Sequence, residues 1–293
     1  MKVVVLTGGV SNEREVSLIS AKNVEEALKR LGYETEIFDI KDGLENLQVS
    51  KDDVVFPVVH GKEGEGGDLQ KKLEKREIKF VGSGSKALKK GWEKIPFKKF
   101  CDSEGIITPK WQVIKDQNEI SISMPIVVKP SDSGSSIDIF FAHTESDLTE
   151  IPFKDLFEKY KELIIEEFIQ GVEVTCGVLG DMALPVLEIV PPEGGSFDYE
   201  NKYNGKTKEI PFAPSLPEEI QKEVQKISLE IHQKLGCKDI SRSDFLVKDG
   251  TIYALEINTI PGLTSESLFP KEAKAIGIGF DELMGRLIKM QTN

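Results

Sequence analysis

The stretch 242-RSDFLVKDGTIYALEINTIPG-262 predicts two adjacent β-strands joined by a tight turn. Apolar residues stand on both sides of the Asp249-Gly250 pair, which is typical of a two-residue hairpin turn. Asp244 and Glu256 lie among these apolar residues, where a carboxylate without a partner is costly to bury. Each carboxylate is therefore expected to be paired or bound to a metal ion.

Asp244, Glu256 and Asn258 together indicate a metal site. Glu256 and Asn258 are two residues apart on one strand, so their side chains point to the same face. Oxygen ligands without His or Cys suit Mg²⁺, which takes its remaining ligands from water and substrate phosphates. A polar strand end would also explain Glu256 and Asn258, but Arg242 and the Pro261-Gly262 turn flank the same residues and favour a site.

Charge and composition limit the classes of partner. The net charge of -12 is spread over 293 residues, which disfavours nucleic-acid binding but leaves room for a phosphate ligand on local lysines. The apolar run at 3–6 is too short for a signal peptide or a membrane span, and no other run is long enough. The scattered Cys101, Cys176 and Cys237 are typical of a reducing compartment. We therefore expect a cytoplasmic protein that binds small molecules, and neither nucleic acid nor membrane.

The order of predicted elements indicates an α/β protein with three units, at residues 1–91, 92–179 and 180–293. In the first unit, strands at 3–6, 34–40 and 53–59 alternate with helical patterns, the first of them capped by Ser11. This order predicts a parallel sheet with ligands at the carboxyl ends of its strands. The other two units contain predicted strands at 126–129, 137–141, 163–167 and 183–190, helices at 86–104, 153–161 and 217–235, and a long loop at 191–214 that is typical of a lid.

A Ser/Gly loop at 131–136 follows the strand that ends in Lys129-Pro130. Small residues allow backbone N–H groups to approach phosphate oxygens, and Lys129 adds positive charge beside them. The loop is not a P-loop, because no Gly-Lys-Ser/Thr follows and the next element is a strand. A plain hairpin loop would explain it equally well.

Three further segments carry weaker signals. The strand ending at 166–169 offers an apolar wall and backbone hydrogen bonds that would suit adenine. Glu13 and Glu15 stand at a helix start, where the helix dipole alone favours carboxylates. The glycine-dense segment 60–70 follows a buried strand, and a turn-rich connection would account for it.

Taken together in their order and spacing, these segments resemble the D-alanine–D-alanine ligases of the ATP-grasp superfamily over nearly the full length of the chain. The resemblance implies an N-terminal parallel-sheet substrate domain followed by two domains, α+β in type, that clamp ATP. The matching segments are 8-GGVSNEREVSL-18, His60-Gly61 with Gly64-Glu65 and Leu69-Gln70, 128-VKP-130 with 134-GSS-136, 197-FDYENKY-203, 242-RSD-244, 255-LEINTIPGLT-264 and Ser267-Leu268.

The resemblance also implies which residues contact nucleotide and metal. Lys94, Lys129, Ser136 and Lys202 would contact the phosphates, with Lys202 at the transferred group. Asp244, Glu256 and Asn258 would hold two Mg²⁺ ions, for which Mn²⁺ could substitute, with Glu256 bridging them. Adenine and ribose would be held by Glu166, Glu167, Phe168, Ile169 and Glu173.

By the same resemblance, Glu15, held by Ser135 and Tyr203, would receive the ammonium group of the first D-alanine. Arg242 and the backbone at Gly262 would face the reacting carboxylate. The remaining substrate contacts would come from Ser267 and Leu268, at the second D-alanine, and from His60 and Glu65, which would shape the pocket.

Four positions depart from the family pattern. Ser241 and Ser243 stand where Gly and an apolar residue are usual on either side of Arg242, and Gly66 stands where Asp is usual. Asp138 replaces a Gly two residues after the Ser-Ser pair, and its carboxylate would repel phosphate if it pointed inward.

The implied reaction is ATP-dependent ligation of two D-alanine molecules through an acyl phosphate, which releases ADP and phosphate and serves peptidoglycan precursor synthesis. A homodimer is expected, because members of the family are commonly dimers. Two other hypotheses stay open: an ATP-grasp ligase that joins a different carboxylate and amine, and a non-catalytic nucleotide-binding regulator. The segment around Glu15 speaks against the first, because ATP-grasp relatives share the nucleotide clamp but not this segment.

Overall fold

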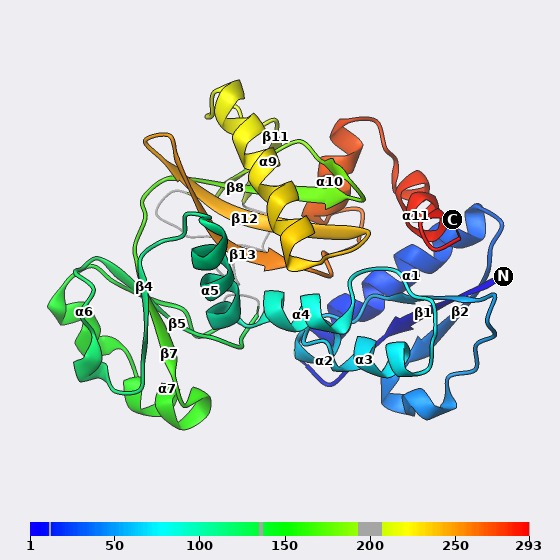
Figure 1. The fold of residues 1–293 in the computed structure, drawn as a ribbon, viewed down its shortest axis with the longest axis horizontal. Coiled ribbons are helices and arrows are strands. Elements are labelled where there is room, and N and C mark those ends of the chain that lie inside the picture. The colour runs from blue at the N-terminus through cyan, green and yellow to red at the C-terminus, as the bar shows by residue number, and fades with distance from the viewer. Residues whose placement is uncertain (12, 135–136, 193–206, 293) are drawn as a thin grey trace.

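The computed structural model describes residues 1–11, 13–134, 137–192 and 207–292 (Figure 1). Its strands form three sheets. In Figure 1 the central unit with β4, β5 and β7 lies at one end of the long axis, β1 and β2 lie at the other, and α4 and α5 lie between them. Within these four ranges, no helix combines the length and the apolar character that crossing a membrane requires.

The N-terminal sheet has the strand order β2-β1-β3 and is parallel, as the sequence predicts. Helix α1 (Arg14–Arg30) connects β1 to β2 and begins after Glu13, two residues later than a cap at Ser11 would place it. Instead, the Ser11 hydroxyl accepts a hydrogen bond from the Glu13 backbone N–H at 3.3 Å. The other elements of this unit are β1 (Lys2–Thr7), β2 (Glu34–Asp39), η1 (Ile40–Asp42), η2 (Leu44–Asn46), β3 (Val54–Pro57), α2 (Lys62–Glu65) and α3 (Asp68–Lys75).

Two helices lead into the central unit, α4 (Ser85–Trp92) and α5 (Lys94–Glu104). The break between them lies at Glu93, and Pro96 stands in the first turn of α5, where its missing N–H breaks no helical hydrogen bond. The antiparallel sheet β4-β7-β5-β6 follows. Its elements are β4 (Trp111–Ile114), η3 (Gln117–Glu119), β5 (Ile126–Pro130), β6 (Phe140–Ala142), α6 (Glu145–Glu150), α7 (Phe153–Tyr160) and β7 (Leu163–Glu167).

The third sheet has the order β11-β10-β8-β12-β13, with β9 paired to β8. Strand β8 (Val172–Leu179) pairs with β10 and β12, so we propose a unit boundary near residue 171 in place of 179. The turn between β12 and β13 is the predicted hairpin, with positive φ at Asp249 (50°) and Gly250 (77°). The other elements are β9 (Met182–Ala183), β10 (Leu187–Val190), β11 (Lys208–Pro211), α9 (Glu218–Leu235), β12 (Ile240–Lys248), β13 (Thr251–Asn258), α10 (Leu268–Ala275) and α11 (Phe280–Lys289).

Helices α9 and α10 cover opposite faces of this sheet. Cys176 and Gly177 are neighbours on β8, so they point to opposite faces. Cys176 belongs to one apolar cluster with Val224 and Ile231 of α9, whereas Gly177 lies against Glu272 and Phe269 on α10. The edge strand β13 packs against α4 and α5, the two helices that lead into the central unit.

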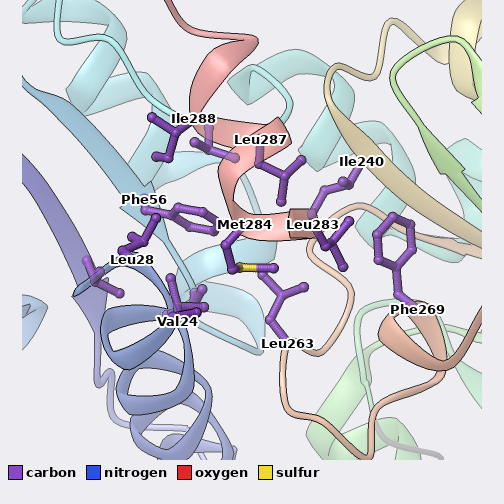
Figure 2. Packing of buried hydrophobic residues seen from close by; sticks show 14 of the residues in the cluster. Val24, Leu28, Phe56, Ile240, Leu263, Phe269, Leu283, Met284, Leu287 and Ile288 are labelled. Carbon is purple, nitrogen blue, oxygen red and sulfur yellow. The ribbon is translucent and has the colours of Figure 1, made fainter. Parts of the chain in front are cut away.

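One apolar core joins the two ends of the chain (Figure 2). Val24 and Leu28 of α1 and Phe56 of β3 pack with Leu283 and Leu287 of α11. All five side chains are at most 1% exposed. The C-terminal helix is therefore part of the N-terminal unit's core, and it anchors the third sheet against that unit.

Candidate active site

A cleft of about 780 Å³ lies where the three units meet. Its walls come from α1, α2, the start of α5, the Ser/Gly loop, the β12–β13 hairpin and the segment that leads into α10. The cleft brings together nine of the residues that the resemblance assigns to the site, namely His60, Glu65, Lys94, Arg242, Glu256, Asn258, Gly262, Ser267 and Leu268.

The β12–β13 pairing places four polar side chains on one face of the sheet. Arg242 lies opposite Asn258, and Asp244 lies opposite Glu256. Two carboxylates directly opposite each other repel unless a cation lies near. Asp244 meets this requirement with Arg242, whose Nε and Nη2 donate to the two carboxylate oxygens at 3.1 and 3.0 Å. Asp244 itself does not line the cleft but supports Arg242 from behind, where it also accepts a hydrogen bond from Thr175.

Arg242 is a positive charge whose position is fixed by Asp244. Its side chain is 11% exposed. Burial lowers the pKa of the guanidinium, but attraction and hydrogen bonding by Asp244 outweigh burial and hold the pKa above its ordinary value. The cation therefore persists at any pH at which the protein is folded.

Lys94 approaches Glu256 from the opposite wall. Its Nζ is 3.8 Å from Glu256 Oε2 and donates to the Ser133 carbonyl at 2.6 Å. The described residues contain no cluster of three or more His, Cys, Asp or Glu side chains arranged for metal binding, so a magnesium site here depends on Asn258 as the third ligand. The chemistry fits, since two carboxylates and an amide oxygen on one face are hard donors and the cleft leaves Glu256 partly exposed.

His60 and Glu65 form a buried polar corner of the cleft. His60 Nδ1 is 3.8 Å from Glu65 Oε1, and its Nε2 is 3.4 Å from the Ser20 hydroxyl. Glu65 Oε1 accepts a hydrogen bond from the Gly61 N–H at 2.9 Å. Burial raises the pKa of Glu65, and the contact with His60 offsets only part of this effect.

Glu15 does not lie in the cleft. It is exposed on α1, whereas Glu13, at the N-cap of the same helix, lines the cleft wall. Two residues along a helix correspond to a rotation of about 200°, so only one of these carboxylates can face inward. The prediction that Glu15 receives a substrate ammonium group therefore moves to Glu13. The sequence showed both carboxylates but not the residue at which the helix begins.

The segment from Gly262 to Leu268 closes one end of the cleft. The Ser267 hydroxyl lies 2.9 Å from Thr264 Oγ1 and accepts a hydrogen bond from the Thr264 N–H at 3.2 Å. A side chain at Gly262 would collide with Ser267, because a Cβ there would lie 2.7 Å from its Oγ. Ser267 is the N-cap of α10, so the N-terminal end of this helix, which carries partial positive charge, lies at the wall of the cleft.

The residues assigned to adenine and ribose form a second group, outside the walls of this cleft. Lys129 Nζ is 2.8 Å from Glu166 Oε1, on neighbouring strands β5 and β7. Phe168 follows β7 and makes edge contacts with Phe141 and His143. The other members of this group are Glu167 at the end of β7, the buried Ile169 and Glu173 on β8.

Lys98 belongs to this second group and was not predicted. It is fully buried on α5, and its Nζ is 3.1 Å from the same Glu166 oxygen that pairs with Lys129. A signal was present in the sequence, because Lys98 follows Lys94 by one helical turn in a run that is otherwise largely apolar.

Four predicted site residues lie outside the described part of the chain, namely Ser135, Ser136, Lys202 and Tyr203. Most of the expected lid at 191–214 lies there as well.

Two departures from the family pattern have structural explanations. Asp138 accepts hydrogen bonds from Lys159 and from the Tyr160 hydroxyl, at 2.7 and 2.5 Å. These bonds lower the pKa of Asp138 and hold its carboxylate against α7. Ser241 is buried on the face of β12 away from Arg242, and its hydroxyl lies 2.7 Å from His232 Nδ1.

Comparisons with known proteins point to one family. A family model described as "D-ala D-ala ligase C-terminus" matches residues 89–289. The D-alanine–D-alanine ligase of Syntrophotalea carbinolica is 40% identical over 292 residues, which cover 98% of this chain and 95% of the relative. That of Aquifex aeolicus is 39% identical over 294 residues and is covered completely.

Solved structures of such ligases superpose on nearly the whole chain. D-alanine–D-alanine ligase from Bacillus anthracis, complexed with ATP, superposes with a TM-score of 0.84 at 29% identity, over 100% of this chain and 97% of that one. VanG D-Ala:D-Ser ligase from Enterococcus faecalis has a TM-score of 0.84 at 30% identity, over 99% of both chains. The relatives and the solved structures match 98–100% of this chain, and the family model matches more than half of it, so this chain belongs to the D-alanine–D-alanine ligase family.

Proposed function

We propose that this protein joins two D-alanine molecules into D-alanyl-D-alanine at the expense of ATP and so supplies a precursor of peptidoglycan. One observation carries the proposal: Arg242, Glu256 and Asn258 share one face of a hairpin, with Lys94 opposite. This concentration of positive charge and oxygen ligands suits phosphoryl transfer, in which catalysis is mostly positioning and charge stabilisation.

In the first step, the carboxylate of one D-alanine attacks the γ-phosphorus of ATP, which gives an acyl phosphate and ADP. In the second step, the amine of the other D-alanine attacks the acyl carbon, and phosphate leaves as the tetrahedral intermediate collapses. Both steps build negative charge at one place. Arg242, oriented by Asp244, would stabilise that charge together with Lys202 and the backbone at Gly262.

The substrates would be positioned by residues at opposite ends of the cleft. Glu13 would receive the ammonium group of the first D-alanine, with Ser135 and Tyr203 beside it. Ser267 and Leu268, at the N-terminus of α10, would hold the carboxylate of the second D-alanine, since a helix N-terminus favours an anion. His60 and Glu65 would limit the room for the methyl groups.

We assign two Mg²⁺ ions, replaceable by Mn²⁺, to Asp244, Glu256 and Asn258. Magnesium bound there would neutralise charge on the nucleotide phosphates. For Asp244 to become a ligand, it would share its oxygens with Arg242, which now takes both of them. The nucleotide phosphates would contact Lys94, Lys129 and Ser136. Its base and ribose would lie along 166–169 and Glu173.

An assay of ADP release tests this function against its alternatives. Purified protein is incubated with ATP, Mg²⁺ and either D-alanine, L-alanine, D-lactate or D-alanine with D-serine, and dipeptides are identified by mass spectrometry. Release of ADP with D-alanine alone, with D-alanyl-D-alanine as the product, is expected. No release with any substrate would favour a nucleotide-binding regulator. Release of ADP only when D-serine is present would show that D-serine is the acceptor, as the name of the VanG D-Ala:D-Ser ligase states for that protein.

The homodimer stays a prediction, which light scattering at micromolar concentration would test. A mass near 65 kDa, twice the 32.6 kDa of the chain, is expected.

A further inference from the structure

Three charged side chains meet in the interior beside α5. Lys98 and Lys129 both approach Glu166 Oε1, at 3.1 and 2.8 Å. Lys98 is 0% exposed, Glu166 2% and Lys129 7%. The three side chains carry one more positive charge than negative, and a buried charge is costly unless its partners are well placed.

The electrostatics keep Glu166 ionised. Burial raises the pKa of this carboxyl group, but the attraction of Lys129 and Lys98 outweighs burial and brings the pKa below its ordinary value. Burial dominates for Lys98 and lowers the pKa of its ammonium group. Removal of either lysine would therefore leave the other partners poorly compensated.

Hydrogen bonds connect this cluster to β13, the strand that carries Glu256 and Asn258. Lys98 Nζ donates a hydrogen bond to the Thr108 hydroxyl, which in turn donates to the Ala254 carbonyl on β13 at 2.8 Å. A backbone hydrogen bond joins the same two segments, since the Ala254 N–H donates to the Ile107 carbonyl at 2.8 Å. Ala254 is two residues before Glu256 on the same strand. A continuous path of contacts therefore runs from the candidate metal face to the strands of the central sheet.

Helix α5 carries both connections. Lys94 and Lys98 are one turn apart and lie on the same side of the helix. Lys94 faces Glu256 and the Ser133 carbonyl, while Lys98 faces Glu166 and Thr108. One rigid turn of helix thus sets the spacing between the two groups of proposed nucleotide contacts.

We propose that Lys98 is a positioning residue of the nucleotide site: it holds Glu166 and Lys129 in place and ties the central sheet to strand β13. This inference rests on the proposed use of ATP. Lys98 need not touch the nucleotide, because its effect passes through Glu166 and Lys129. The surplus positive charge of the cluster would be compensated by the nucleotide's phosphates.

The test compares Lys98→Met with Lys99→Met, an exposed neighbour on the same helix. The KM for ATP, the KM for D-alanine, kcat and the dissociation constant for ATP by calorimetry are measured for each. For Lys98→Met we expect the KM and the dissociation constant for ATP to rise at least tenfold, with the KM for D-alanine within twofold of wild type. Lys99→Met should match wild type throughout.

A purely structural role would give a different pattern. It would lower the melting temperature and the fraction of active protein while leaving the KM for ATP at its wild-type value, and that result would overturn the proposal. Lys98→Arg, which retains the charge, should recover part of the ATP affinity. If Lys98→Met does not fold, Lys98→Arg is judged alone. Its bulkier guanidinium should still raise the KM for ATP at least threefold, and a wild-type KM would reject the proposal.

Failure of the proposed function can be distinguished from failure of this inference. If the proposed function is wrong, the wild-type protein itself releases no ADP with D-alanine. Calorimetry with ATP still decides the role of Lys98 in that case. A weaker affinity in Lys98→Met would support positioning, and an unchanged affinity would refute it.

Discussion

Two carboxylates at the start of α1 face different surroundings because the backbone directs their side chains differently. Glu13 and Glu15 are two residues apart, yet one lines the cleft and the other is exposed. The sequence predicted correctly that Glu256 and Asn258 share one face of the hairpin, because strand periodicity decides which side chains share a face. Their role as metal ligands stays a prediction. It could not choose between Glu13 and Glu15, since that choice depends on the residue at which α1 begins.

Exchange of each carboxylate for its amide tests this assignment. Glu13→Gln should lower kcat/KM for D-alanine about 10- to 100-fold, because a hydrogen bond to a charged group is worth about 1.5–3 kcal/mol. Glu15→Gln is the matched control and should stay within twofold of wild type. The reverse ranking of the two variants would return the role to Glu15.

A second residue-scale prediction concerns pH. Hydrogen bonds from Arg14 lower the pKa of Asp39 to about 2, compared with about 3.9 in an unfolded chain. A carboxyl group whose pKa is lower in the folded state stabilises the fold above the unfolded pKa, and that contribution fades as pH falls towards the folded pKa. Asp39→Asn should therefore cost about 2 kcal/mol of unfolding free energy at pH 7 and progressively less below about pH 4.

Urea unfolding at pH 7, 4 and 3 measures this difference. Asp281→Asn serves as a control, because its pair with Arg30 is exposed and should contribute less. A penalty for Asp39→Asn that is the same at pH 3 and pH 7 would contradict the predicted role of the charge.

At the scale of elements, the register of β12 against β13 creates the site. Arg242 faces Asn258 and Asp244 faces Glu256 only in this register, and a shift by one residue would turn every one of these side chains to the other face. The Asp249-Gly250 turn predicts the hairpin, but counting outward from it would pair Asp244 with Leu255. A register shift between Asp244 and Phe245, which no local sequence pattern indicates, brings Asp244 opposite Glu256. The pairing of β8 with β12 was not predictable in the same way, because about sixty residues separate the two strands and no local pattern links them.

Glu256→Gln tests the metal assignment at this hairpin. It removes a negative charge but little volume, so the fold should persist while kcat falls about 10²- to 10³-fold, as for loss of one preorganised electrostatic contact. Titration with Mn²⁺ should show weaker activation. Glu282→Gln, on the exposed side of α11, should behave as wild type. Near-normal turnover of the Glu256 variant would remove the carboxylate from the proposed metal site.

At the scale of the whole molecule, the two chain ends share a core. Helix α11 supplies Leu283, Met284, Leu287 and Ile288 to a cluster that includes strands β1 and β3. The apolar pattern of α11 was visible in the sequence, but the surface that it covers was not. This core holds the third unit against α1, and both α1 and the β12–β13 hairpin line the cleft.

Leu287→Ala probes this long-range packing. A fully buried Leu truncated to Ala should cost about 2–5 kcal/mol, and unfolding should remain one transition, since the cluster joins both ends of the chain. Urea curves from far-UV circular dichroism and from tryptophan fluorescence should coincide. Ile276→Ala, at a largely exposed position, should change little. Separate transitions for the two probes would show that the units unfold independently.

The proposed ligase reaction depends on activation of a substrate carboxylate by phosphoryl transfer, and an isotope-transfer measurement tests this step directly. D-alanine labelled with ¹⁸O in its carboxylate is incubated with ATP and the protein, and the released phosphate is analysed by mass spectrometry. An acyl phosphate requires one ¹⁸O atom to pass from the carboxylate to each phosphate formed during dipeptide synthesis. Unlabelled phosphate released together with D-alanyl-D-alanine would contradict the account.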